Sequence, residues 1–404
     1  MPTIRVAIPA MDELDYLPVT LDALCQQKTN ATFEVYICVN QPDNYWSDAT
    51  KSTICEHNRL LLEYLQHYPF LTLHVLDYSS PGKGWIGKKT GVGFARKVLF
   101  EKILSVSEPD DLIVSLDADT YVEPDYLESI ASPFRKNKSL NAIAVPYYHR
   151  LDPQDEICNR TMLRYEFYMR NYAINLLKIK SPYGFTALGS AIVMRTSALR
   201  KVGNITPLQS GEDFYLVQKF CKMGGLSLFN IKCVYPASRF SDRVPFGTGP
   251  AMIQGSRGIW DSYPIYPHTC FAPIQEAYTH LHDIFDNNFI ITDNDFLSFL
   301  QKDTEKQDIW QDIRKNVSDY PHFVKAFYQK ADGLRLLQYV RTKQRQQPVK
   351  EEVALYQNLQ KWIPSQCPSW FSPTITLNQY SIQQLNSIRD ALFHLEQILR
   401  RDYG

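Results

Sequence analysis

The sequence predicts an α/β protein with a mostly parallel sheet, helices on both faces of that sheet, and a helical C-terminal region. Three observations lead to this fold class. Near the N-terminus, apolar runs alternate with amphipathic helical patterns, which is typical of βαβ units with right-handed crossovers. From about Pro273 onward, the residues are polar and follow a helical pattern. The length of 404 residues suits one large α/β domain with an appendage.

Four strands are expected in the first 120 residues. Continuous apolar runs are typical of buried parallel strands, and such runs lie at residues 4–8, 33–39, 71–76 and 112–116. Helices are expected between these strands, at residues 14–24, 60–65 and 92–104. The first of these helices has one apolar face, formed by Leu14, Leu17, Leu21 and Leu24.

After residue 120 the pattern changes to longer helices with fewer strands. A long helix is expected at residues 155–179, followed by a strand at 187–194 and helices at 196–202 and 212–223. Residues 236–258 are rich in Gly, Pro and Arg and show no periodicity. We therefore expect a functional loop in this last segment.

The final helix has the clearest pattern in the C-terminal region. Ser381 and Gln384 form a capping box at its start. Its apolar face is formed by Ile382, Leu385, Ile388, Leu392, Leu395 and Leu399. We expect this face to be buried against the α/β domain or a partner chain.

The composition excludes several classes of site and partner. The 43 acidic and 43 basic residues balance, so no general attraction to nucleic acid or anionic membranes is expected. The eight cysteines contain no Cys-x-x-Cys pair, which argues against zinc and a disulfide framework. No apolar stretch approaches the ~20 residues of a membrane span, and the early strand argues against a signal peptide. A cytoplasmic protein is expected, and peripheral contact with the inner face of the membrane stays open.

Two aspartates follow the fourth expected strand directly. Asp117 and Asp119 are two positions apart, so both carboxylates point to the same side of an extended chain end. Ligands of open α/β sheets bind at the carboxyl ends of such strands. Hard divalent cations prefer oxygen ligands and also bind diphosphate. The pair is therefore a candidate metal site, and an ordinary solvated Asp-Ala-Asp-Thr turn is the alternative.

Five short segments occur in an order that carries a family resemblance. They read IPAMDE at residues 8–13, NQPD at 40–43, GKGW and GVGFAR at 82–96, DAD at 117–119, and GSA with GEDFYL at 189–216. Each is weak alone, but the ordered series is specific. This order resembles the family 2 glycosyltransferases, over roughly residues 1–250. Members of that family have the GT-A fold and transfer a sugar from a nucleotide-sugar.

The resemblance implies roles for the acidic residues. Asp119 should ligate a divalent metal, Mn²⁺ or Mg²⁺, and Asp117 should contact the ribose or the metal. Asp213 matches the catalytic base of inverting members, and Glu212 matches its acidic neighbour. For Asp213, the structural alternative is a helix N-terminal acid favoured by the helix dipole.

The resemblance also assigns residues to a UDP- or GDP-sugar. The assigned residues are Pro9, Ala10 and Asp12 along the nucleoside, Asn40 at the base, Arg96 by the base or diphosphate, and Gly189 at the donor sugar. Asp12 and Glu13 are equally readable as helix N-terminal acids, and Arg96 as a solvated helix residue. The segment at residues 82–84, with Lys88 and Lys89, is a candidate for neutralising phosphate.

Four features bear on specificity and mechanism. Asn40 and Gln41 stand where the family usually has an acidic pair, which leaves the nucleotide open. The Gln-x-x-Arg-Trp motif of processive members is missing, and residues 238–249 run in its place. Arg239 or Arg243 of that segment either contacts the diphosphate or forms structural salt bridges. His149 and His268 are candidate extra metal ligands, with a structural role as the alternative for each.

These expectations combine into one predicted activity. We expect a metal-dependent, inverting, non-processive glycosyltransferase that acts on a carbohydrate or glycolipid acceptor in surface or secreted glycan synthesis. The catalytic domain is expected at residues 1–270, with a nucleotide-binding half at 1–120 and an acceptor-side half at 121–270, followed by the helical region at 271–404. A retaining GT-A transferase and a catalytically silent scaffold are the alternatives.

Overall fold

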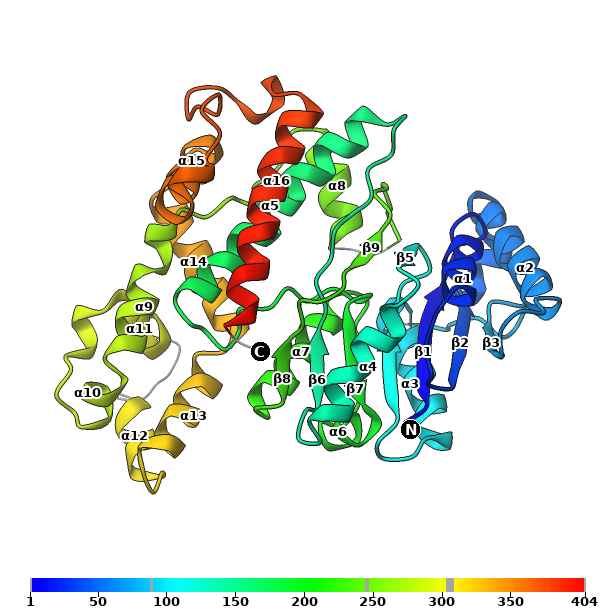
Figure 1. Ribbon diagram of the computed structural model, residues 1–404, viewed down its shortest axis with the longest axis horizontal. Helices are drawn as coiled ribbons and strands as arrows, with labels where there is room; N and C mark the ends of the chain where they lie inside the picture. Colours follow the sequence, from blue (N-terminus) through cyan, green and yellow to red (C-terminus); the bar gives the residue numbers. More distant parts are fainter. Residues whose placement is uncertain (1, 88–89, 244–246, 303–308, 403–404) are drawn as a thin grey trace. The chain divides into compact units, whose positions relative to one another are not determined.

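The computed structural model describes residues 2–87, 90–243, 247–302 and 309–402 (Figure 1). The chain divides into two compact units. The first comprises Met1–Met162, Thr186–Ile259 and Arg400–Gly404, and the second comprises Leu163–Phe185 and Trp260–Leu399. The domain boundary expected at residue 270 stays a prediction.

The first unit is built on a sheet of seven strands within the described residues. Their order is β3-β2-β1-β4-β7-β6-β8 (Figure 1). The strands are β1 (Ile4–Ala10), β2 (Phe33–Asn40), β3 (Leu73–Tyr78), β4 (Leu112–Ser115), β6 (Ala142–Ala144), β7 (Ile192–Arg195) and β8 (Leu226–Leu228). The first four are mutually parallel, whereas β7 is antiparallel to both β4 and β6. The expected mostly parallel α/β sheet is therefore confirmed.

Helices cover this sheet and bury its strands. The helices of the first unit are α1 (Leu17–Cys25), α2 (Ser52–Gln66), α3 (Val92–Val106), α4 (Tyr126–Lys136), α6 (Thr196–Lys201), α7 (Glu212–Lys222) and α8 (Thr248–Ser256). Helix α3 packs on β1 and β2, and α2 packs on β2 and β3. Every residue of β1 and β4 is buried, which explains why their sequences are apolar without alternation.

Several elements differ from the sequence-based expectations. The segment 236–258, expected to be a loop, contains α8 and follows a strand, β9 (Val234–Pro236), that pairs with β5 (Thr120–Val122). The strand expected at residues 187–194 begins only at Ile192. Residues 187–191 are irregular because Gly189 lies against Arg96, where a Cβ would be 1.8 Å from the guanidinium Nη2.

The second unit is helical, as expected. It contains most of α5 (Glu156–Lys178) and α16 (Ile382–Arg401), together with α9 (Ala272–Thr279), α10 (Leu281–Phe285), α11 (Asp295–Lys302), α12 (Ile309–Lys315), α13 (Tyr320–Lys330), α14 (Gly333–Gln346) and α15 (Glu351–Trp362). Short 3-10 turns complete the two units: Asp43–Ser47, Ala49–Lys51, His268–Phe271, Ile291–Asp293, Pro364–Gln366 and Leu377–Gln379. None of the described helices is long and apolar enough to cross a bilayer.

Helix α16 has the cap and the buried face that its sequence predicts. The Ser381 and Gln384 side chains each accept the other residue's backbone N–H, at 3.1 and 2.9 Å. Leu385, Ile388 and Leu392 are at most 1% exposed.

The buried charges of the second unit are paired. Arg170 of α5 bonds Glu166 and Glu396, each at 2.7 Å, and all three side chains are inaccessible to solvent. At the end of α16, Arg400 belongs to the first unit. Its guanidinium donates to the backbone oxygens of Ala144 and Phe229, at 2.5 and 3.0 Å.

Candidate active site

A cavity of about 250 Å³ lies in the first unit, at the carboxyl ends of β1 and β4. These two strands are parallel neighbours, and the chain leaves β1 for β2 on its other side. This reversal of strand order is where open α/β sheets bind their ligands. Residues from the segments 188–190, 210–213 and 236–249 complete the lining.

Most of the residues predicted from the sequence meet in this cavity. Its lining includes Pro9, Ala10, Asn40, Arg96, Asp117, Asp119, Gly189, Glu212, Asp213 and Arg243. They come from segments up to about 230 positions apart, so the cavity depends on the whole fold of the first unit. Asp12 is assigned to the nucleotide by the resemblance but does not line the cavity.

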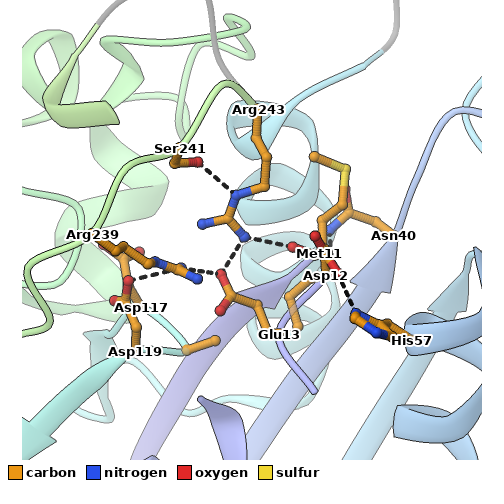
Figure 2. Close-up of polar contacts among 12 residues, drawn as sticks. Met11, Asp12, Glu13, Asn40, His57, Asp117, Asp119, Arg239, Ser241 and Arg243 are labelled. Atoms are coloured by element: carbon orange, nitrogen blue, oxygen red, sulfur yellow. Dashed lines mark hydrogen bonds and ion pairs between the residues drawn. The ribbon is translucent and has the colours of Figure 1, made fainter. Parts of the chain in front are cut away.

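Asp12 is turned away from the cavity, towards α2 (Figure 2). Its carboxylate lies 2.7 Å from His57 Nδ1, and its backbone N–H donates to Asn58 Oδ1 at 2.9 Å. The residue has a φ of +59°, a left-handed conformation that aspartate tolerates better than most residues. Asp12 therefore fixes the chain after β1, and the adjacent Glu13 faces the cavity instead.

Asn40 lines the cavity, but both ends of its amide are bonded to protein. Its Nδ2 donates to the Ala10 oxygen at 2.9 Å, and its Oδ1 accepts the Trp85 indole N–H at 3.1 Å. The residue is 3% exposed. In this arrangement, Asn40 fixes the backbone of Ala10, which also lines the cavity.

Arg96 joins three elements of the site. It lies on α3, is 4% exposed and forms ion pairs with Asp117, after β4, and with Glu212, at the start of α7. Arg96 is therefore not a solvated helix residue. Two glycines allow this close packing: Gly189 admits the guanidinium, and at Gly93 a Cβ would lie 2.1 Å from the Leu208 oxygen.

Burial and crowding of like charges shift the titration of these acids. Burial raises the pKa of Glu212 to about 7; Arg96 opposes the shift, while Asp213 and Asp117 add to it. Burial also raises the pKa of Asp117, against the opposing charge of Arg96 and with added repulsion from Asp119. Carboxyl groups shifted in this way, in a cavity, are typical of functional sites.

A second group of ion pairs centres on Glu13 (Figure 2). Glu13 is 4% exposed and accepts from both Arg239 and Arg243. Arg239 also lies 2.8 Å from Asp119, and Arg243 donates to the Met11 oxygen at 2.5 Å. Both arginines line the cavity. The segment 238–243 is thus attached to the end of β1, whereas residues 244–246 lie outside the described residues.

Sequence patterns provide only a partial signal for Glu13. It stands in the first motif, where it was equally readable as a helix acid, and its partners lie more than 220 positions away. Arg239 and Arg243 lie in a segment without periodicity. Their charges suggest that an acidic partner is close in the fold, but the sequence does not identify that partner as Glu13.

Asp213 differs from the other acids of the cavity. Its Oδ1 accepts the backbone N–H of Phe214 at 2.7 Å, at the start of α7. Among the described residues it has no ion-pair partner, unlike Asp117, Asp119 and Glu212. Its carboxylate can therefore accept a proton from a bound group without breaking an ion pair.

The charge of the lining fits a divalent cation. Among the described lining residues, five carboxyl groups face three guanidinium groups, a surplus of two negative charges when all are ionised. No three His, Cys, Asp or Glu side chains in the described part of the chain form a ready metal cage. A site with two protein carboxylates, completed by phosphate oxygens and water, matches what Mg²⁺ commonly uses.

The remaining candidate ligands predicted from the sequence are two histidines, the turn at residues 82–84, and two lysines. His149 lines the cavity, whereas His268 is bonded through Nδ1 to Asn358 at 3.1 Å. The amides of Gly82 and Gly84 donate to Asp43 at 2.8 and 3.2 Å, so this turn is closed on a protein carboxylate. Lys88 and Lys89, expected near phosphate, lie outside the described residues.

Comparison with protein families gives one match. Residues 2–229 match a family described as "Glycosyltransferase like family 2". This match covers more than half of the 404 residues. No curated protein gives a significant match to the sequence.

Solved structures that resemble the chain do so at low sequence identity. S. aureus TarS 1–349 in complex with UDP-GlcNAc is 13% identical, with a TM-score of 0.44 over 100% of this chain and 91% of that one. Glucosyl-3-phosphoglycerate synthase from Mycobacterium tuberculosis, with Mn²⁺, UDP and phosphoglyceric acid, is 14% identical, with a TM-score of 0.37 over 64% and 79%. GalNAc-T7 with UDP, GalNAc and Mn²⁺ is 14% identical, with a TM-score of 0.40 over 82% and 58%.

Proposed function

This chain belongs to the glycosyltransferase-like family 2, and from that premise we propose that it is a metal-dependent, inverting, non-processive glycosyltransferase. The donor is a UDP- or GDP-sugar, and the acceptor is a hydroxyl of a carbohydrate or glycolipid in surface or secreted glycan synthesis. One observation carries the proposal: an unpaired carboxylate, Asp213, shares a cavity with the strand-end pair Asp117 and Asp119.

The donor side of the cavity is assigned to the strand-end acids and the arginines. Asp117 and Asp119 would hold Mn²⁺ or Mg²⁺, which when bound neutralises the leaving diphosphate. Arg243, at the mouth of the same cavity, supplies a fixed positive charge for phosphate oxygens. Gly189, which lines the cavity with its backbone beside the Arg96 guanidinium, is assigned to the donor-sugar side.

Asp213 is assigned the role of general base. It takes the proton of the acceptor hydroxyl while the acceptor oxygen bonds to the anomeric carbon and the bond from that carbon to the diphosphate oxygen breaks. Attack on the face opposite the diphosphate inverts the configuration. Glu212, paired with Arg96, holds the start of α7 in place next to this base.

Asparagine at position 213 tests this assignment. Asp213→Asn preserves size but cannot accept a proton, so it should retain nucleotide and Mn²⁺ binding and lose transfer by about a hundredfold or more. Asp242→Asn is the matched control, because Asp242 is exposed, nearby and absent from the cavity lining. The control should transfer at the parental rate.

The anomeric configuration of the product distinguishes an inverting from a retaining mechanism. NMR of the anomeric proton should show inversion. Retention of configuration would remove the role of base from Asp213 and favour a retaining transferase on the same fold. Donor binding without transfer to any acceptor would favour a catalytically silent protein.

A further inference from the structure

One guanidinium nitrogen of Arg239 bridges the buried carboxylate of Glu13 and the partly buried carboxylate of Asp119. Arg239 Nη2 lies 2.6 Å from Glu13 Oε1 and 2.8 Å from Asp119 Oδ2 (Figure 2). The three side chains are 15%, 6% and 14% exposed, so water competes little with these contacts. A cation supplied by the protein thus already occupies one of the two strand-end carboxylates.

A divalent cation bound to Asp119 Oδ2 and this contact of Arg239 exclude each other. A metal ion binds carboxylate oxygen at about 2.0–2.6 Å. With Arg239 Nη2 only 2.8 Å from Asp119 Oδ2, the two positive charges would compete for the same oxygen and repel each other at close range. For the ion to bind there, Arg239 must withdraw from Asp119.

Glu13 provides a second place for the arginine. Its Oε1 already accepts from Arg239, while its Oε2 is buried and has no hydrogen-bond partner among the described residues. Arg239 can therefore release Asp119 and stay paired with Glu13. This avoids the large cost of leaving a buried charge without a partner.

An aromatic ring supports the arginine in its bridging position. The Arg239 guanidinium lies 4.1 Å from the centroid of the Tyr16 ring, which follows Glu13 by one short turn. A cation–π contact of this kind stabilises the bridging position without changing the charge of the cavity.

We propose that Arg239 is a built-in competitor of the divalent cation at Asp119, and that Glu13 receives the arginine when the cation binds. The inference rests on the metal site of the proposed function. Arg239 and Glu13 are positioning residues that set the affinity for the cation. The cavity then keeps Asp119 neutralised until the ion displaces Arg239.

The test is calorimetric titration of Mn²⁺ alone into the full chain and its variants. Arg239→Gln should bind Mn²⁺ about tenfold more tightly than the matched control Arg243→Gln. The control removes the same charge from the same cavity, but Arg243 contacts Glu13 and the Met11 oxygen rather than Asp119. Any general effect of the cavity's charge is therefore common to both variants. Equal affinities would overturn the inference.

A second variant leaves the charge unchanged and covers the case in which Arg239→Gln does not fold. Tyr16→Leu removes the ring that supports Arg239 and should tighten Mn²⁺ binding by a few-fold, with circular dichroism confirming the fold. Unchanged or weaker binding would count against the inference.

The outcomes also separate this inference from the proposed function. The wild-type protein could transfer sugar while Arg239→Gln and Arg243→Gln bind Mn²⁺ with equal affinity. That result would contradict the role of Arg239 as a competitor and leave the proposed function standing. Absence of Mn²⁺ binding in every variant overturns the competitor together with the metal part of the proposed function. Inversion and the Asp213→Asn result remain independent of both.

Discussion

Three aspartates of the cavity differ in their ion pairing, and this difference assigns their chemistry. Asp117 is paired with Arg96, Asp119 with Arg239, and Asp213 with neither. A carboxylate held by a guanidinium is oriented by it and can bind a cation once the guanidinium gives way. A carboxylate without such a partner can gain a proton with little loss, which suits a base.

Alanine at position 119 tests the metal assignment. Asp119→Ala should abolish the Mn²⁺-dependent part of UDP or GDP binding and leave the fold intact, because Arg239 keeps its pair with Glu13. A thermal-shift titration of each nucleotide, with and without Mn²⁺, measures this, since a ligand raises stability by RT ln(1 + [L]/Kd). Asp242→Ala is the control. Undiminished Mn²⁺-dependent stabilisation in Asp119→Ala would remove the metal from this residue.

Glu212 should make stability depend on pH. Its pKa rises from an ordinary 4.5 to about 7 on folding, chiefly through burial. The folded state therefore binds this proton more tightly than the unfolded chain. The resulting stability is fully present below pH 4.5 and is lost as the pH rises through about 7. Glu212→Gln cannot titrate, so the free energy of unfolding of the wild type should fall relative to the variant by about 1–3 kcal/mol between pH 4.5 and 8.

Urea unfolding at four pH values across this window gives the comparison. If the two free energies of unfolding run parallel with pH, the burial of Glu212 does not shift its titration as described. The same titration should lower transfer activity in mildly acidic buffer, because protonation of Glu212 weakens its ion pair with Arg96.

The motif order located most of the site, and its failures have physical reasons. Asp117 follows strand β4 and Asp213 is the second residue of helix α7, where sequence patterns are strong. Asp12, expected along the nucleoside, does not line the cavity, because its direction depends on a backbone φ of +59° that adjacent residues do not disclose.

Long and regular helices and strands could be predicted from the sequence, whereas short or irregular ones could not. The strands β1 and β2 have seven and eight residues, and the runs of apolar side chains identify them. The strands β6, β8 and β9 have three residues each, too short for any periodic signal. Helix α8 contains two glycines and a proline, which hide its pattern, although Ala251 and Met252 are fully buried.

Helix α16 allows a test of buried and exposed positions on one element. Leu392 is fully buried, so Leu392→Asp places a charge in the apolar interior of the second unit and should lower the free energy of unfolding by about 3–5 kcal/mol. Ile398→Asp, at a position 41% exposed on the same helix, should change it by less than about 1 kcal/mol. Denaturant unfolding measures both. Equal midpoints for the two variants would mean that the leucine face is not buried.

For the chain as a whole, the fold class was predictable but the composition of its units was not. Alternating apolar and helical segments indicate the sheet, and the polar helical pattern indicates the second unit. The sequence does not indicate that Leu163–Phe185 belongs with residues more than 75 positions later, because the buried pairs of Arg170 join parts of the chain distant in sequence. Pairing between distant segments leaves no local periodicity.

The contacts of Arg400 have a consequence for the order of folding. Its guanidinium bonds the carbonyl oxygens of Ala144 and Phe229, so these contacts close loops of 256 and 171 positions. On the ribosome, at about 5–20 residues per second, β6 is synthesised roughly ten seconds or more before Arg400. During that interval the Ala144 oxygen can accept the Phe229 N–H, its other native partner at 3.1 Å, but neither carbonyl has the guanidinium. The first unit therefore acquires these native contacts only after the helices of the second unit that precede Arg400 have been made.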